Sequence, residues 1–289
     1  MPNKYIDYTD AQLENLINNV YQGSISPSVL PVDLYVIIFD RLTNAVYKGF
    51  GDTLETLTGE SADRLLLEYY VYNIAIFSGA KLHQQAKDMS NLLFDENGMK
   101  RDFSEFRAII KGDSFHQGLF SLYNDTYLRT EYNTAFSTAQ MGREWLSIVN
   151  DSDVFPFLKY VTAHDERVRH SHAEFDGVVR PVGDAFWNTH VPPNGFNCRC
   201  RLVQLNPEDD VFTVTPDDRI KDMPSPDSSL FNTNPGKSGY IFDENIHPYF
   251  KKIDERYKVV QSMNFGLPTP PKPKTPYVAP KVKKAKNKK

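Results

Sequence analysis

The chain has 289 residues, of which 40% are hydrophobic and 24% are charged, a composition typical of a globular protein that buries a core. No stretch approaches the ~18–20 apolar residues of a membrane helix, and the most apolar run, 34–39, is closed by Asp40 and Arg41. The N-terminus lacks the charged and apolar regions of a signal peptide, so we expect a protein that is made and used in a cytoplasm. Two cysteines are too few for a disulfide scaffold.

Charge is distributed unevenly along the chain. Residues 268–289 hold eight lysines, six prolines and no acidic side chain. The other residues carry 25 basic and 37 acidic side chains, so their net charge is −12 although the whole chain has only −4. An acidic body with a basic tail indicates two different contact surfaces.

The first 150 residues have apolar side chains at helical spacing. Thr9 is a candidate N-cap for a helix over 10–21, and Pro31 opens a second helix that continues to about residue 47. Further helices are predicted over 62–93, 103–111 and 115–149. Their aromatic side chains recur at helical spacing, which is typical of core packing.

The pattern changes after Asn150. Strands are predicted over 155–162, 177–181 and 198–205, and residues 192–195 form a turn just before the cysteines. We therefore predict an α+β fold in which a small module follows a region of long helices. The expected organisation is a helical region 1–114, the module 115–205, an extended arm 206–267 with a helix over 245–262, and a disordered tail 268–289 rich in proline and lysine.

Four of the seven histidines and both cysteines lie within the 37 residues 164–200. Because side chains two apart on a strand share a face, Cys198 and Cys200 are expected to present both sulfur atoms to one side, which suits a tetrahedral Zn²⁺. His172 and His190 are the first candidates for the other two ligands. His170, His164 and Asp165 are alternates.

Two alternatives stay open for this cluster. His170 and His172 can both face a metal on an extended backbone but not on a helical turn. The cysteines can also be buried, reduced thiols beside hydrogen-bonded histidines, because Cys-x-Cys is not a standard zinc-finger spacing. A metal with four protein ligands has no open position for a water nucleophile, so we expect any metal here to be structural.

The segment 165–169 alternates acidic residues and arginines. It can form a salt-bridge network that fixes the local backbone, since arginine and carboxylate groups pair in bidentate fashion. It can also be catalytic, but a hydrolase needs a nucleophile or metal-bound water beside a base. That set cannot be assembled here without the residues assigned to the metal, so a structural role is favoured.

The order of these residues resembles the phage Mu F-like minor head proteins, also called the phage head morphogenesis family. Its pattern joins a helix with Arg-Thr-Glu, then Asp-x-x-Val-Arg-x-x-His, a Gly-Val pair, Trp-x-x-x-x-Pro-Pro-x-Gly and Cys-Arg-Cys. The match runs over roughly 115–205, and no resemblance is identified for 1–110 or for the C-terminal arm. Besides the metal candidates, its motif residues are Arg129, Glu131, Asp165, Arg167, Arg169, Gly177, Trp187, Pro192, Pro193 and Gly195.

The resemblance implies a low-copy, non-enzymatic head protein of a tailed bacteriophage. Such a protein is expected in the head interior or at the portal vertex, and in the host cytoplasm during assembly. Its implied partners are the portal protein and the major capsid or scaffold protein, and its implied role is head morphogenesis or DNA delivery. The resemblance also strengthens the prediction of a structural zinc ion.

The basic tail predicts contact with packaged double-stranded DNA, because lysines that neutralise phosphates release counterions. The candidates for this contact are Lys281, Lys283, Lys284, Lys286, Lys288 and Lys289. A solubilising tail without a specific partner is the alternative. Two other functions stay open for the whole chain: a metal-dependent hydrolase or nuclease, and a DNA-binding module that acts during packaging or entry.

Overall fold

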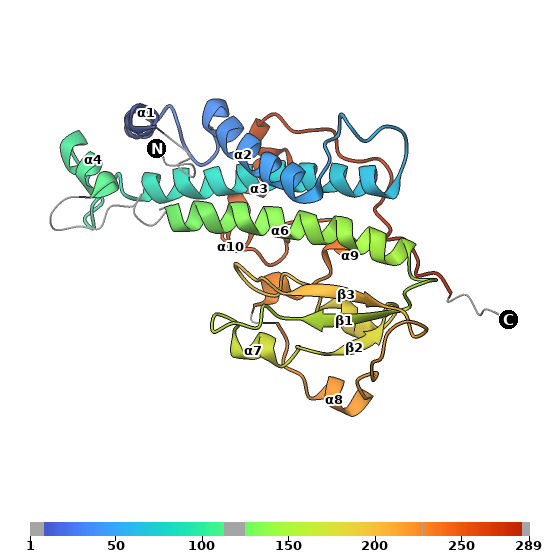
Figure 1. Cartoon of the computed structure of the whole chain (residues 1–289). Coiled ribbons are helices and arrows are strands. Elements are labelled where there is room, and N and C mark those ends of the chain that lie inside the picture. Colours follow the sequence, from blue (N-terminus) through green and yellow to red (C-terminus); the bar gives the residue numbers. More distant parts are fainter. Residues whose placement is uncertain (1–8, 113–124, 227, 285–289) are drawn as a thin grey trace. The chain divides into compact units, whose positions relative to one another are not determined.

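The N-terminal half of the described chain is helical, and a small sheet follows it. The computed structural model describes residues 9–112, 125–226 and 228–284, and it confirms the predicted α+β class. The long helices are α1 Asp10–Gln22, α2 Val32–Phe50, α3 Ala62–Asn91, α4 Phe103–Lys111 and α6 Asp125–Asn150 (Figure 1). None of the helices in this part of the chain is both long and apolar enough to cross a membrane.

Side-chain caps fix where these helices begin. Thr9 is the N-cap of α1 as predicted: its Oγ1 accepts from the Gln12 backbone N–H at 3.2 Å, and Gln12 Oε1 accepts from the Thr9 N–H at 2.8 Å. Gly23 ends α1 with φ 80°, a conformation that glycine adopts without strain. Ser61 Oγ accepts from the Arg64 N–H at 3.1 Å at the start of α3. The predicted start of the last long helix, 115–124, lies outside the described residues.

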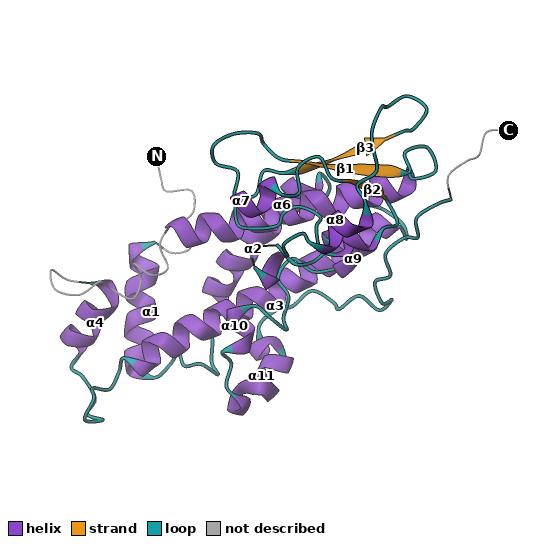
Figure 2. Ribbon diagram, turned by 90° about the horizontal axis from the view of Figure 1, so that it is seen from below, coloured by secondary structure: helices purple, strands orange, loops and turns teal. Residues whose placement is uncertain are grey.

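Three antiparallel strands form one sheet in the order β2-β1-β3. They are β1 Phe157–Val161, β2 Val179–Pro181 and β3 Arg201–Leu205. Phe157 lies opposite Pro181 on one side and Leu205 on the other. Figure 2 shows the three strands side by side in this one sheet.

The C-terminal half of α6 and the sheet share one core. Met141, Trp145, Ile148 and Val149 lie one or two helical turns apart on α6 and are buried. The sheet and the loops beside it supply Leu158, Tyr160, Phe175, Val178, Val182, Phe186, Trp187, Val191 and Leu202. This core holds in place the segments that carry the histidines and cysteines.

The helical elements that follow β3 in the described chain are short. They are α8 Asp217–Lys221, η2 Ser229–Phe231, α9 Pro235–Ser238, α10 Pro248–Lys251, η3 Glu255–Tyr257, α11 Lys258–Ser262 and η4 Asn264–Gly266. The single helix predicted over 245–262 is therefore wrong. Pro248 starts α10 only at its first position, and Asp254 has an extended backbone at ψ 151° that separates α10 from η3.

Contacts divide the described residues into two units. The first lies within 1–44, 72–132 and 244–271, and the second within 45–71, 133–243 and 272–289, so α2, α3 and α6 contribute to both. The second unit contains the sheet and its core. The domain boundaries drawn from the sequence remain predictions about which segments fold independently.

The first unit contains a buried charge cluster around Glu131, whose role the sequence motif did not reveal. Glu131 Oε2 lies 2.6 Å from Lys81 Nζ and 3.4 Å from Arg41 Nη2, and Tyr249 Oη donates to Glu131 Oε1 at 3.2 Å. The Lys81 side chain is 1% exposed. The cluster thus joins α2, α3, α6 and α10 through one carboxylate.

Residues 272–284 pack within the second unit, which differs from the disorder predicted for this segment. The Tyr277 and Tyr69 rings lie 5.9 Å apart, and Tyr277 Oη donates to the Gly236 carbonyl. Further along, the Lys283 N–H donates to Ser152 Oγ at 2.9 Å. Tyr277 thus anchors a proline-rich segment that has no hydrophobic core of its own. The end of the predicted tail, 285–289, lies outside the described residues.

Gly49 marks a close approach between α2 and α6. A Cβ atom added at Gly49 lies 2.1 Å from the Phe136 backbone carbonyl oxygen, which cannot move without shifting α6. We expect Gly49→Ala to lower the free energy of unfolding by about 2–3 kcal/mol through overpacking. Chemical denaturation measures this, and Gly183→Ala is the matched control because its added Cβ contacts only Val282, at 4.0 Å. Equal stability of the two variants would contradict the close approach.

Candidate metal centre

Two short segments bring the candidate ligands together. His172 lies on α7, His170–Ala173, and its side chain is 2% exposed. Cys198 and Cys200 lie between a turn at 195–197 and the first residue of β3. The β3 strand is paired with β1 and α7 lies between β1 and β2 in the sequence, so the sheet fixes the ends of both segments.

The three donor atoms have the spacing of a tetrahedral zinc site. His172 Nδ1 lies 3.7 Å from Cys198 Sγ and 3.7 Å from Cys200 Sγ, and all three atoms lie within 4.8 Å of one another. Zn–S bonds of ~2.3 Å and Zn–N bonds of ~2.0 Å at a tetrahedral angle give S···N separations of about 3.5 Å. These three residues could therefore hold a metal ion.

The local backbone differs from the sequence prediction in two respects. The cysteines precede β3 instead of lying on it, and Asn197 before them has a positive φ of 56°. The two thiols thus lie between a turn and the start of the strand, and not on the strand itself. His170 and His172 lie on a helical turn, and only His172 joins the donor group. On a helical turn the two histidines were not expected to face a metal together, and the structure agrees.

The other candidate ligands have partners elsewhere. His190 Nε2 lies 3.1 Å from the Pro224 carbonyl oxygen, and its Nδ1 lies 2.8 Å from Thr189 Oγ1. His164 Nε2 lies 2.9 Å from Asp176 Oδ1. Among the described residues, the compact donor group contains His172 and the two cysteines but not His190, so the predicted set of four is reduced to three.

The two thiols have opposite protonation preferences. A hydrogen bond with Cys200, supported by His172 and by the backbone N–H groups of Asn194 and Cys200, holds the pKa of Cys198 down to about 4 although burial raises it. The same hydrogen bond with Cys198 and burial raise the pKa of Cys200. Both sulfur atoms would have to be thiolates to hold a metal, so binding of Zn²⁺ would release the protons that the pair still carries.

Hydrogen bonds also hold the loops around the donors. Arg199 makes a bidentate ion pair with Asp165 at 2.6 and 2.7 Å, and its guanidinium holds the pKa of that carboxyl at about 2. Arg169 Nη2 donates to the Phe196 carbonyl at 2.6 Å. The segment 165–169 thus pairs with the cysteine loop, whereas the sequence analysis expected pairing within the segment itself.

The remaining motif residues support the same loops. Gly177 has φ 75°, which favours glycine, and its N–H donates to the Tyr160 carbonyl at 2.9 Å. Tyr160 Oη donates to Asn194 Oδ1 at 2.9 Å in the turn that contains Pro192, Pro193 and Gly195. Arg129 and Arg167 are exposed, on α6 and in the loop before α7 respectively.

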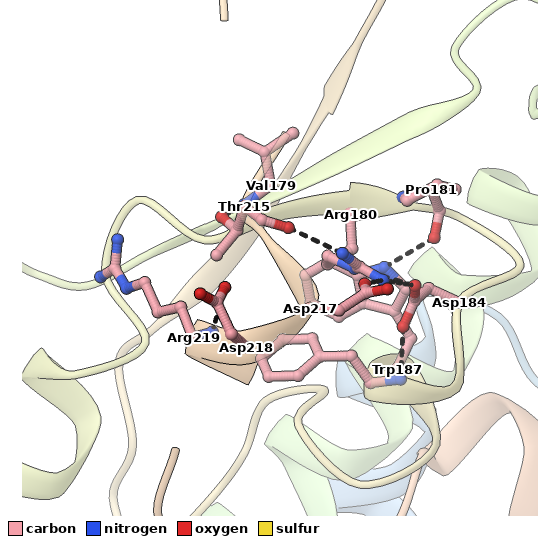
Figure 3. A network of polar contacts seen from close by, with 10 residues as sticks. Val179, Arg180, Pro181, Asp184, Trp187, Thr215, Asp217, Asp218 and Arg219 are labelled. Atoms are coloured by element: carbon pink, nitrogen blue, oxygen red, sulfur yellow. Dashed lines mark hydrogen bonds and ion pairs between the residues drawn. The ribbon is translucent and has the colours of Figure 1, made fainter. Parts of the chain in front are cut away.

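A polar network around Arg180, which the sequence analysis did not identify, anchors the arm after β3 (Figure 3). Arg180 on β2 pairs with Asp184 at 2.5 Å and Asp217 at 2.7 Å, and donates to the Thr215 carbonyl at 2.7 Å. Trp187 Nε1 donates to the Pro181 carbonyl at 3.0 Å close by. The only sequence signal was the i,i+4 spacing of Arg180 and Asp184, because Asp217 is distant in the chain.

The family comparison matches the part of the chain that carries the sheet and the donor group. A model of the family "Phage Mu protein F like protein" matches residues 70–203. Residues 70–203, slightly under half of the chain, are phage Mu F-like. The predicted resemblance is confirmed, and the matched region begins earlier than the predicted residue 115 because it includes most of α3.

Two curated relatives match shorter stretches. The chain is 40% identical over 79 residues to the "Putative capsid assembly protein F" of Escherichia phage Mu, which is 27% of this chain and 18% of that protein. It is 35% identical over 81 residues to the "Mu-like prophage FluMu F protein" of Haemophilus influenzae, which is 28% of this chain and 19% of that protein. The chain thus spans about a fifth of the length of these Mu F-like relatives. No solved structure matches it.

Proposed function

We propose that this Mu F-like protein is a minor head protein that acts in head morphogenesis of a tailed bacteriophage. The main support is the match over residues 70–203 to a family in which the phage Mu member is named a putative capsid assembly protein. The protein acts in the head interior or at the portal vertex, in contact with the portal protein and the major capsid or scaffold protein. During assembly it is present in the host cytoplasm.

The role proposed for the donor group is a structural zinc site. Its support is the pair of 3.7 Å S···N separations, which agrees with tetrahedral zinc. A bound ion would link α7 to the cysteine loop before β3. This link stiffens the surface that the module offers to other head proteins.

Deletion of the gene from the phage or prophage that encodes it tests the assembly role. We expect deletion to reduce the yield of DNA-filled, infectious heads sharply, and expression of the protein in trans to restore it. Electron microscopy counts empty and filled heads, and plaque assays measure infectivity. Unchanged numbers of filled, infectious heads after deletion would contradict the proposal.

A metal-dependent hydrolase is the second candidate, and one cavity favours it. Glu144 on α6 lines a cavity of about 290 Å³ together with Cys198 and Cys200, and burial raises the pKa of its carboxyl. A carboxylate beside a metal-bound water could serve as a general base. Cleavage of DNA or peptide that is lost in Glu144→Gln, with the metal retained, would favour this candidate over the structural one.

The lysines near the C-terminus are proposed to contact packaged DNA. Lys281, Lys283 and Lys284 are exposed, while Lys286, Lys288 and Lys289 lie outside the described residues. Replacing all six with glutamine is expected to weaken DNA binding and to flatten its salt dependence, by about 0.9 in the slope of log K against log[salt] for each phosphate that the lysines no longer neutralise. Fluorescence anisotropy at several salt concentrations measures this slope.

The control variant for the lysine series is Lys251→Gln with Lys258→Gln, two exposed lysines in the first unit of the chain. We expect this control to bind DNA as the unchanged protein does. Equal salt slopes for the six-lysine variant and the unchanged protein would indicate that the tail is only solubilising.

A further inference from the structure

The two edges of the sheet differ in how far the chain itself covers them. On the β2 side, the Thr215 N–H donates to the Val179 carbonyl at 3.0 Å, and the Val179 N–H donates to Thr215 Oγ1 at 3.0 Å. The arm after β3 therefore closes that edge. On the other side β3 is the outermost strand (Figure 2), and no further strand or bridge of the described chain pairs with it. An uncovered edge recruits strands from other chains.

The register shows which backbone groups of β3 face outward. The Tyr160 N–H on β1 donates to the Val178 carbonyl at 2.8 Å, so the Tyr160 backbone is directed to the β2 side and not to β3. Tyr160 lies opposite Leu202 in the pairing of β1 with β3. In an antiparallel pair of this kind both residues point their N–H and carbonyl groups away from each other. The outward groups of β3 thus belong to Leu202 and, two residues on, to Gln204.

These outward groups are not used by the protein itself. Within residues 9–112, 125–226 and 228–284, the backbone N–H and carbonyl groups of Leu202 and Gln204 make no hydrogen bond across the outer edge. Unpaired backbone groups of a native protein bond water. Each of the two residues therefore offers one donor and one acceptor to a strand that replaces this water.

A cavity of about 290 Å³ lies at the start of the same strand. Gln140 and Glu144 on α6 contribute to its lining, as do Cys200 and Arg201 where the chain enters β3. Glu144 is half-buried, and its carboxylate forms no hydrogen bond or ion pair among the described residues. Arg201 is the charged group that acts on it, and Arg201 is exposed, so water screens its charge. A cationic side chain from outside the chain would supply the partner that Glu144 lacks.

The charge of the chain favours a basic partner over a second copy. Residues 1–267 have a net charge of −12. A second copy would bring the same negative charge to the edge and be repelled, whereas a basic segment would be attracted. The cavity beside Arg201 selects in the same direction through Glu144.

We propose that the outer edge of β3 binds an extended, basic segment of another head protein as an additional strand, with a lysine or arginine of that segment placed at Glu144. In this mode of binding the main chain supplies affinity and the side-chain pockets supply specificity. The inference rests on the proposed role in head assembly and names the surface that performs it. It does not depend on the metal centre.

Gln204→Pro tests the edge directly. Proline removes the outward N–H of Gln204, while the bonds between β3 and β1 stay, and proline is tolerated on edge strands. In the phage lacking the gene, with the variant supplied in trans, we expect about tenfold fewer copies per purified head, because a carbonyl of the partner is left unpaired. Quantitative mass spectrometry counts the copies, and thermal unfolding checks that the variant folds. Gln204→Ala is the matched control, since its side-chain Nε2 makes no hydrogen bond in the described structure, and it is expected to enter heads normally.

Two further measurements decide the matter even where the proline variant does not fold. In the isolated, unchanged protein, hydrogen exchange should be fast at the Leu202 and Gln204 amides and slow at Val203, whose backbone faces β1. Glu144→Lys is expected to enter heads poorly, whereas Asp222→Lys, which changes an exposed acid beside α8, should enter normally.

The contrary outcomes are distinct from failure of the assembly role. Slow exchange at both outward amides, or normal entry of Gln204→Pro and Glu144→Lys into heads, would overturn the proposed edge. A dimer of the isolated protein that Gln204→Pro dissociates would assign the edge to a second copy and overturn the basic partner. Absence of the unchanged protein from heads would instead contradict the assembly role on which the inference rests.

Discussion

Cys198→Ser is expected to abolish the stabilisation of the protein by zinc. Since a metal that binds only the folded state stabilises it by RT ln(1 + [L]/Kd), the unchanged protein gains about 4 kcal/mol at a free zinc concentration 1,000 times Kd. The variant lacks one of the three donors that lie within 4.8 Å of one another and should gain almost nothing. Thermal unfolding with zinc and with a chelator measures the difference, and mass spectrometry under native conditions counts the bound ion.

A matched pair of histidine variants controls this experiment. His170 and His172 are two residues apart on α7, but His170 is exposed and only His172 belongs to the donor group. We expect His172→Ala to behave like Cys198→Ser, and His170→Ala to keep both the metal and its stabilising effect. If His170→Ala loses the metal as well, or if neither variant does, the donor set is wrong.

Glu131→Ala is expected to destabilise the helical unit by about 3–5 kcal/mol, because it takes a carboxylate partner away from a buried charge. The charge concerned is the Lys81 ammonium, 2.6 Å from the carboxylate and 1% exposed. Arg41 and Tyr249 bond to the same carboxylate and are also left without it. Denaturant unfolding followed by circular dichroism measures the decrease in stability.

Replacing both partners separates the ion pair from general damage to the core. Lys81→Met combined with Glu131→Met is expected to recover much of the stability, since apolar side chains of similar volume often replace a buried pair without loss. Glu14→Ala removes a carboxylate that pairs with Arg107 at the surface and is expected to have little effect. A double variant no more stable than Glu131→Ala would contradict the role of the buried charges.

Local signals in the sequence were sufficient for the long helices and for the strands. The capping box at Thr9 and Gln12 and the apolar spacing through Met141 and Trp145 depend on neighbouring residues only. Both ends of the first helix, and the C-terminal end of the helix that carries Trp145, were therefore predicted to within one residue. The segment 245–262 failed because its helical spacing competes with Pro248 and with the extended backbone at Asp254. The positions at which this helical segment is interrupted depend on the tertiary contacts of each short turn.

The candidate site was predictable in composition but not in geometry. The clustering of histidines and cysteines within 164–200 pointed to a set of candidate ligands, and three of them are donors that the fold brings together. Sequence spacing could not exclude His190, whose partner Pro224 is 34 residues away. It also could not show that Asp165 pairs with Arg199, or that Arg180 pairs with Asp217, because these pairs depend on how loops distant in sequence return to the sheet.

The presence of this protein in phage heads is the central claim, and quantitative mass spectrometry of purified heads and virions tests it most directly. Induced cultures of the phage or prophage that encodes the chain supply both particles. We expect a few copies per particle, close to the number of portal subunits and far below that of the major capsid protein. Absence from heads and virions alike would contradict the account and would favour the enzymatic and DNA-binding alternatives.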